Sequence, residues 1–178
     1  MKTISQVTIA PGGVKVDGRE VSTATDLGAL YRQCVGDYPK FFKMDGLCKL
    51  GFLGAELLLG KLSAEEKENA AVILFNRSGS LVTDRNYQKT IGDTDYFPSP
   101  ALFVYTLANI VTGEIGIRHK IYGETSFYIM DARNDARMDL IVDSALTTST
   151  PSVVLTGWLE YDNSGSYLAE LKLVKNTK

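Results

Sequence analysis

Unbroken runs of apolar residues predict the buried strands of this chain. Residues 71–75 read Ala-Val-Ile-Leu-Phe with no polar position among them, which is typical of a strand covered on both faces of a parallel sheet. Residues 126–130 have a similar character and are predicted as a second buried strand. Residues 152–159 are predicted as a third strand.

Apolar residues spaced three or four positions apart predict a helix over residues 44–59. Leu47, Leu50 and Leu53 have this spacing, and Gly60 is a suitable helix end. The spacing places these leucines on one face of the helix.

Further helices are predicted from capping residues and local composition. Thr25 or Asp26 can cap a helix that ends near Cys34. A strongly apolar helix is expected over residues 101–112, and an amphipathic helix over residues 131–146.

The two ends of the chain are predicted to add strands. Residues 6–10 form the first strand, followed by a short strand or hairpin around residues 17–18. Residues 167–174 alternate in polarity as an edge strand does, after a turn at residues 162–165. The order of elements predicts one α/β domain over residues 1–178, layered α/β/α, with a five-stranded mixed sheet and a C-terminal antiparallel hairpin.

Composition and charge narrow the class of protein. The chain has 178 residues, of which 44% are hydrophobic and 22% charged, and its net charge is -2. These values are typical of a soluble globular protein, and the lack of a basic excess predicts no nucleic-acid partner. The longest apolar stretch, residues 52–62, contains two charges and is too short to cross a bilayer. Because no export signal is recognised at the start either, a cytoplasmic protein without membrane association is expected.

Few residues offer candidate chemistry. His119 is the single histidine, which excludes a metal site built on histidines. It is interpreted as a structural or surface residue in a partly exposed turn, and a Ser-His-Asp triad using it is the minor alternative. Cys34 and Cys48 lack the spacing of a redox or metal motif and are expected to stay reduced, with a disulfide between them as the alternative. No metal and no cofactor is predicted.

Acidic and basic residues alternate from Asp131 to Asp139. We interpret this pattern as the solvated first turns of a helix, where acidic residues favour the helix dipole. A pair of carboxylates for acid and base catalysis is the alternative interpretation.

Three segments carry a resemblance to a known family. Residues 42–50 read Phe-Lys-Met-Asp-Gly-Leu-Cys-Lys-Leu, and residues 96–100 read Tyr-Phe-Pro-Ser-Pro. Residues 109–118 read Asn-Ile-Val-Thr-Gly-Glu-Ile-Gly-Ile-Arg and are followed by Gly123. Together they resemble the second helix, the proline-initiated helix and the following loop of β-ketoacyl-acyl-carrier-protein synthases, which belong to the thiolase-like superfamily. The resemblance covers the N-terminal half of such a synthase and implies a thiolase-like half fold.

The resemblance places Ala132 at the position of the family's nucleophilic cysteine. In the family this cysteine stands at a sharp turn that opens a helix, and the helix N-terminus activates its thiolate. Ala132 has no nucleophile, and Asp131 puts negative charge where the oxyanion would develop. The two catalytic histidines of the family, which come from its C-terminal half, are also expected to be absent. The implied remnant of the pocket consists of Asp131, Ala132, Arg133 and Asn134.

The resemblance also implies a dimer strand, because the family dimerises through the strand before the nucleophile. Its residues here are Thr125, Ser126, Phe127, Tyr128 and Ile129. The predicted partner is a second copy of this chain or a full-length ketosynthase, with an acyl-carrier protein as a further candidate.

Three functions follow from the resemblance. The first, which we favour, is a non-catalytic ketosynthase-like subunit or scaffold in fatty-acid or polyketide-type biosynthesis, with a polyene pigment pathway as one case. The second is one half of a split 3-oxoacyl synthase that another polypeptide completes. The third is a module that binds an acyl chain or an acyl-carrier protein in the remnant of the pocket. The chain alone is not expected to be an enzyme.

Overall fold

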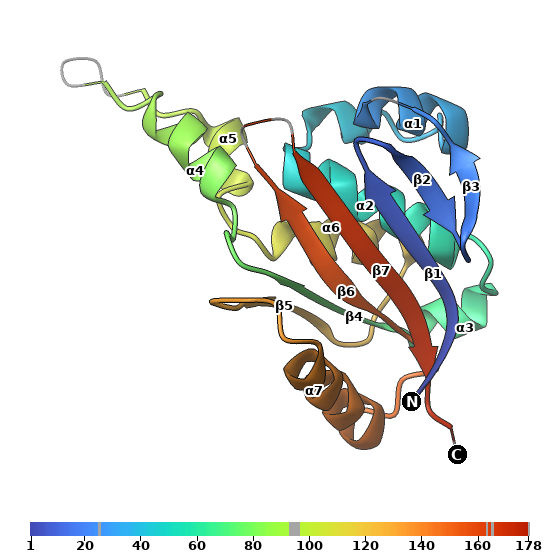
Figure 1. Ribbon diagram of the computed structural model, residues 1–178. Helices are drawn as coiled ribbons and strands as arrows, with labels where there is room; N and C mark the ends of the chain where they lie inside the picture. Colours follow the sequence, from blue (N-terminus) through green and yellow to red (C-terminus); the bar gives the residue numbers. More distant parts are fainter. Residues whose placement is uncertain (25, 93–96, 163, 165, 178) are drawn as a thin grey trace.

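The computed structural model describes residues 1–24, 26–92, 97–162, 164 and 166–177. Its centre is a seven-stranded sheet in the order β3-β2-β1-β7-β6-β4-β5 (Figure 1). The N-terminal part of this sheet is an antiparallel meander made of β1 (Lys2–Ala10), β2 (Gly13–Val16) and β3 (Arg19–Ser22).

The other half of the sheet is built around a parallel core. Strand β4 (Ala71–Asn76) lies between β5 (Thr125–Ile129) and β6 (Val154–Tyr161) and runs parallel to both. Strand β7 (Tyr167–Lys175) is antiparallel to β6 on one side and to β1 on the other. All six residues of β4 are buried, which confirms the prediction from their unbroken apolar run.

Helices cover the two faces of the sheet unequally (Figure 1). The larger core lies on one face, under α1 (Leu27–Cys34), a 3₁₀ helix (Pro39–Lys43), α2 (Gly46–Leu59) and α6 (Ile110–His119). On the other face α7 (Asp135–Thr148) packs alone over β4 and β6 and forms a smaller second core. Three short helices complete the chain: α3 (Ala64–Glu68), α4 (Leu81–Gln88) and α5 (Pro100–Val104).

Local sequence accounts for the position of α2. The Asp45 carboxylate accepts a hydrogen bond of 2.8 Å from the Cys48 N–H and so caps the helix. Leu47, Leu50 and Leu53 are all buried in the larger core. The helix expected from their spacing is therefore confirmed, and it begins two residues later than predicted because residue 45 is its cap.

The sheet differs from the prediction in its size and in its edges. It has seven strands instead of five, because the N-terminal meander joins it through β1 and β7. Residues 167–174 were expected at an edge, but β7 lies inside the sheet. Residues 126–130 were expected to be buried on both faces, but β5 is an edge strand with three exposed residues. The predicted C-terminal antiparallel hairpin is confirmed as β6 and β7; residues 163 and 165 of its turn lie outside the described residues.

Two predicted helices also have different bounds. Instead of one helix over residues 101–112, the chain forms α5 and α6 with residues 105–109 between them. The helix expected from Asp131 begins at Asp135, because the side chain of Asn134 accepts a hydrogen bond from the Arg137 N–H and caps it there. None of the described helices combines the length and the apolar character that crossing a membrane requires.

Candidate functional site

Strand β5 leaves one of its two edges unpaired within the part of the chain that the structure describes. Its inner edge bonds to β4, where the Val72 N–H donates to the Glu124 carbonyl and the Met130 N–H donates to the Asn76 carbonyl, both at 2.8 Å. In a parallel sheet, every second residue of a strand directs both its N–H and its C=O to the strand on one side, and the residues between them direct theirs to the other side. The intervening even-numbered residues, Ser126 and Tyr128, therefore face β4. The N–H and C=O groups of Thr125, Phe127 and Ile129 point outward.

The side chains of β5 anchor the strand but leave its end uncovered. Phe127 packs on the larger core. The Tyr128 ring stacks on Phe75 with 5.4 Å between the ring centroids. Tyr128 is nevertheless 38% exposed and Ile129 is 63% exposed. The last two residues of the strand therefore present apolar surface next to unpaired backbone groups.

A projecting segment continues this apolar surface. We call residues 81–92 and 97–107, which include α4 and α5, the arm; Figure 1 shows its helices standing away from the sheet. The Tyr87 and Phe103 rings pack together at 5.5 Å, but most apolar side chains of the arm are exposed. The exposed ones are Leu81, Ile91, Phe97, Phe103, Val104 and Leu107. A hollow of about 730 Å³ separates the base of the arm from β5, and Ser78, Asn109, Leu107 and Ile129 are among its lining residues.

Hydrogen bonds hold the base of the arm in place beside the sheet. The side-chain amide of Asn76 donates to the Gly79 carbonyl, and its oxygen accepts from the Gly79 N–H, both at 2.9 Å. Gly79 has a φ of 58°, a left-handed conformation that glycine adopts without strain. The Glu160 carboxylate accepts from the Arg77 N–H at 3.0 Å and also contacts the Ser78 hydroxyl. The Ser80 hydroxyl donates to the Thr106 carbonyl, which ties the two ends of the arm together.

The loop at residues 131–134 lies at the surface, between β5 and α7. All four of its residues are exposed. The Asp131 carboxylate accepts a hydrogen bond of 3.0 Å from the Ala132 N–H, and Asn134 caps α7. Arg133 forms ion pairs with Asp135, at 3.0 Å, and with Glu170. Each polar side chain of the loop thus has a structural contact, and Arg133 also lines a hollow beside α7.

The geometry around Ala132 differs from that of an activated nucleophile. Helix α7 begins at Asp135, so the N–H groups of its first turn lie beyond Ala132. The Ala132 N–H already donates a hydrogen bond to the Asp131 carboxylate. An oxyanion could accept from this N–H only by displacing that carboxylate. The position therefore lacks both a nucleophile and a free backbone donor at that residue.

Neither cysteine is placed to serve as a substitute nucleophile. Burial raises the pKa of the Cys48 thiol well above its usual value, and Cys48 is enclosed in the larger core. Partial burial also raises the pKa of the Cys34 thiol. A raised pKa keeps a thiol protonated and unreactive near neutral pH. Both cysteines are free, as the sequence led us to expect.

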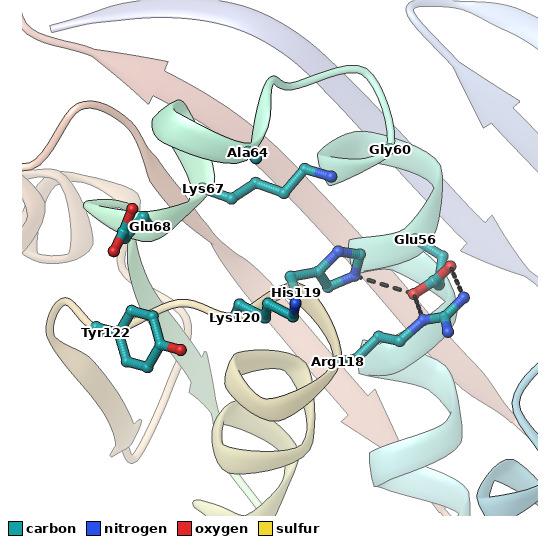
Figure 2. A pocket seen from close by; sticks show the side chains of 9 residues that line it. All are labelled: Glu56, Gly60, Ala64, Lys67, Glu68, Arg118, His119, Lys120 and Tyr122. Atoms are coloured by element: carbon teal, nitrogen blue, oxygen red, sulfur yellow. Dashed lines mark hydrogen bonds and ion pairs between the residues drawn. The ribbon is translucent and has the colours of Figure 1, made fainter.

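His119 lies in a second hollow, at the opposite end of β5 from the loop at residues 131–134 (Figure 2). Its ring nitrogen Nε2 is 3.0 Å from Glu56 Oε1, and its side chain is only 7% exposed. His119 is the last residue of α6 instead of part of a turn after it, and the residue as a whole is half-buried although its side chain is buried. The Glu56 carboxylate also accepts from Arg118 Nε at 2.9 Å.

The outer face of α7 and of the sheet beside it is polar. Asp135, Arg137 and Asp143 of α7 are exposed, and Asp139 is half-buried. Lys172 of β7 forms an ion pair of 3.0 Å with Asp139. Leu140 is the only large apolar side chain of α7 with more than a third of its surface exposed.

Comparison with known proteins gives a fold but no family assignment. No protein-family model and no curated protein sequence matches the chain. A chain from the complex of a ketosynthase with its chain length factor from Xenorhabdus doucetiae has a TM-score of 0.67 and 16% identity, over 98% of this chain and 79% of that one. A chain of the ishigamide ketosynthase/chain length factor has a TM-score of 0.72 and 13% identity, over 98% of this chain and 62% of that one. This chain thus spans less than two thirds of the second structure.

These similarities confirm the predicted thiolase-like, mixed α/β fold. The predicted dimer strand, residues 125–129, coincides with β5. The predicted pocket remnant at residues 131–134 stays a prediction. The apolar arm was not identified from the sequence, because Phe103, Val104 and Leu107 were assigned to one apolar helix over residues 101–112.

Proposed function

We propose that this chain is a non-catalytic ketosynthase-like subunit that pairs with a ketosynthase through β5 and the arm. The observation that carries this proposal is the unpaired edge of β5, bordered by exposed apolar side chains. The two similar structures support the choice of partner, because each is described as a ketosynthase together with a chain length factor. Polyketide-type biosynthesis is accordingly the pathway class that we favour over fatty-acid biosynthesis.

A comparison of the two edges of the sheet supports β5 as an interface. Exposed edge strands invite pairing with other chains, and proteins usually protect them with charged residues or proline. The opposite edge, β3, follows this rule, since Arg19 and Glu20 are exposed. Strand β5 contains no charged residue and no proline over Thr125–Ile129. An unprotected edge is expected where a partner covers it.

The arm would enlarge the contact beyond the strand. Eight of the fourteen large apolar side chains found exposed lie on β5 or the arm, so this side of the molecule is far more apolar than the rest of the described surface. Apolar side chains grouped on one side of a soluble protein mark interaction sites. A partner that pairs with β5 would cover Ile129 and could also contact Leu107 at the base of the arm, because both line the same hollow.

The non-catalytic part of the proposal rests on the loop at residues 131–134 and on the two cysteines. Ala132 has no nucleophilic atom, and Asp131 occupies its backbone donor. The thiols of Cys34 and Cys48 both have raised pKa values. Neither the Ala132 position nor either cysteine therefore supplies an activated nucleophile for attack on an acyl thioester.

The alternative of a split enzyme is disfavoured by the polar outer face of α7. A second polypeptide that completed the fold would need an apolar surface to dock on, since stable interfaces have apolar centres from which charged residues are depleted. The face beside α7 instead carries Asp135, Arg137, Asp139 and Asp143. The apolar residues are on the side of β5, where one partner can be accommodated.

Binding of an acyl chain by this chain alone is also less well supported. Many lining residues of the hollow beside β5 have polar side chains, including Ser78, Ser80, Asp84 and Asn109. A pocket that held an alkyl chain would be lined mainly by apolar residues. Pairing of β5 with a partner could add the missing apolar walls, so an acyl-chain site would belong to the complex.

The proposal is tested by co-expressing this chain with a ketosynthase from the same genome and measuring the particle mass by light scattering. A mass that equals one copy of this 19.5 kDa chain plus the ketosynthase protomers is expected. A dimer of this chain without ketosynthase would replace the proposed partner with a second copy. A particle that stays at the monomer mass in both preparations would refute pairing through β5.

A further inference from the structure

The hollow that contains His119 has the size and the charge of a ligand site, and none of the arguments above uses it. It measures about 510 Å³, within the range of about 300–1,000 Å³ typical of small-molecule pockets. It lies between the C-terminal ends of α2 and α6 and the short helix α3 (Figure 2). Tyr122 and Glu68 at its border precede β5 and β4, so it lies at the opposite end of these strands from residues 131–134.

Three cationic side chains and two carboxylates line this pocket, which we call the His119 pocket. Lys67, Arg118 and Lys120 line it together with His119, against the carboxylates of Glu56 and Glu68. Figure 2 shows Lys67 stretched across the pocket above the His119 ring, whereas the Glu68 carboxylate lies apart from it. The chain as a whole has a net charge of -2, so this concentration of cations is local.

The arginine of the pocket is already occupied by carboxylates of the chain. Arg118 contacts Glu56 through Nε at 2.9 Å and contacts Asp37 through its terminal nitrogen at 2.7 Å. The same Glu56 carboxylate lies 3.0 Å from His119 Nε2. Within the described residues, by contrast, no carboxylate lies within 4.0 Å of the ammonium group of Lys67 or Lys120. Two ammonium groups thus remain for a ligand.

The C-terminal ends of two helices border the pocket, and at each end a carbonyl group is satisfied within the chain. Carbonyl groups at a helix C-terminus favour cations when they are unsatisfied. At the end of α6, however, the Gly116 carbonyl accepts from the Lys120 and Ile121 N–H groups, the latter at 2.9 Å. At the end of α2 the Glu56 carbonyl accepts from the Gly60 N–H at 3.2 Å.

We propose that the His119 pocket binds a small molecule through a phosphate group, with Lys67 and Lys120 as the residues that contact the phosphate. Lysine ammonium groups bind phosphate as point charges, whereas a planar carboxylate is better matched by the fork of an arginine. The Arg118 fork is taken, which leaves the two ammoniums and the exposed phenol of Tyr122 as donors, while the Glu68 carboxylate at the border lies apart from Lys67. This site is independent of the proposed pairing through β5.

The single histidine of the chain provides a selective probe for this site. The His119 ring is the only imidazole that NMR would record, and it is buried in the wall of the pocket. We would titrate inorganic phosphate at constant pH and ionic strength, with chloride as the matched salt, and follow the ring resonances. A saturable shift is expected with phosphate and not with chloride.

Two double variants separate the site from general electrostatics. Lys67→Gln with Lys120→Gln should weaken phosphate binding at least about tenfold, because two charge-assisted contacts are lost. Lys15→Gln with Lys43→Gln removes the same charge at exposed positions that do not line the pocket and should bind as the parent does. Lys67→Arg with Lys120→Arg should restore much of the affinity.

Two outcomes would overturn the proposal. The first is a His119 shift that does not saturate, or that chloride reproduces. The second is unchanged binding in the Lys67→Gln, Lys120→Gln variant while its thermal unfolding matches that of the parent. Because the measurement uses the chain without a ketosynthase, neither outcome depends on whether β5 forms an interface.

Discussion

Proline substitutions at two neighbouring positions of β5 are expected to affect different properties, one the binding of the partner and the other the stability of the fold. The Ile129 N–H points outward, so Ile129→Pro should remove a bond to the partner and leave the ladder with β4 intact. Proline is tolerated at the edge of a sheet when its missing N–H would face away from the neighbouring strand. The Tyr128 N–H points to β4, so Tyr128→Pro should damage the fold itself.

The magnitudes follow from the exposure and contacts of the two residues. Ile129 is 63% exposed, and covering that part of an isoleucine contributes roughly 1–2 kcal/mol to association. The lost backbone bond adds about 1 kcal/mol. Ile129→Pro should therefore raise the dissociation constant about 30- to 150-fold per substituted subunit. It should change the free energy of unfolding by less than about 1 kcal/mol.

Tyr128→Pro should instead lower the free energy of unfolding by about 3–5 kcal/mol. It removes an inward hydrogen bond, leaves a carbonyl of the buried strand β4 unpaired, and deletes the stacking of Tyr128 on Phe75 at 5.4 Å. Binding of each variant to the ketosynthase would be measured by sedimentation, and stability by urea unfolding of the chain alone. Equal losses of binding and of stability in the two variants would refute the assignment of outward and inward groups.

Three further results are expected. Ala132→Cys should show no malonyl-dependent condensation by the chain alone, because Asp131 occupies the Ala132 N–H and α7 begins only at Asp135; detectable condensation product would contradict this. Burial raises the pKa of the Glu56 carboxyl, but hydrogen bonds from His119 and Arg118 lower it by more, so its pKa in the folded chain lies below the unfolded value of 4.5. Ionised Glu56 therefore stabilises the fold. This contribution is complete above pH 4.5 and is lost as the pH falls through the folded-state pKa. Glu56→Gln should lower stability at pH 7 by about 2 kcal/mol and flatten its decline in acid, and parallel pH profiles of the variant and the parent would count against this. Gly157→Ala should lower the free energy of unfolding by more than about 3 kcal/mol, because Gly157 has a φ of 147° and a Cβ there would lie 2.0 Å from the Glu170 carbonyl oxygen. Gly113→Ala, on the exposed surface of α6, should instead raise it by up to about 1 kcal/mol. Thermal unfolding of the two variants measures this difference, and equal unfolding temperatures would contradict it.

The elements that the sequence predicted best are those with strong local signals. The unbroken run at residues 71–75 identified β4, and the leucine spacing together with Asp45 identified α2. Asp26 caps α1 as expected, through a hydrogen bond of 2.8 Å from the Ala29 N–H. Residue 25, the other cap that was considered, lies outside the described residues.

Sequence patterns could not give the place of each strand in the sheet. Apolar residues in a strand are expected both where helices cover it and where a partner chain would do so. Phe127, Tyr128 and Ile129 therefore predicted burial, although Ile129 is 63% exposed in the single chain. The same ambiguity applies to Phe103 and Leu107, which were assigned to one helix, whereas Phe103 lies in α5 and Leu107 in the break between α5 and α6.

The candidate sites were also only partly predictable. The resemblance predicted a dimer strand at residues 125–129, which form β5, and its assignment of a vacant nucleophile position to Ala132 stays a prediction. The His119 pocket joins Glu56, Lys67 and Lys120, which come from three segments far apart in the chain. The sequence around His119 contains no motif, so it did not predict that these residues would form a pocket. Ion pairs such as Glu56–Arg118 depend on how α2 and α6 pack, which local sequence does not determine.

Amide hydrogen exchange along β5, measured with and without the ketosynthase, tests the central claim most directly. In the free chain the outward N–H groups of Thr125, Phe127 and Ile129 should exchange quickly, whereas Ser126 and Tyr128 should be protected by β4. In the complex the three outward groups should become protected, and those of β3 (Arg19–Ser22) on the opposite edge should not change. A complex that forms while the outward groups of β5 still exchange as in the free chain would contradict the account.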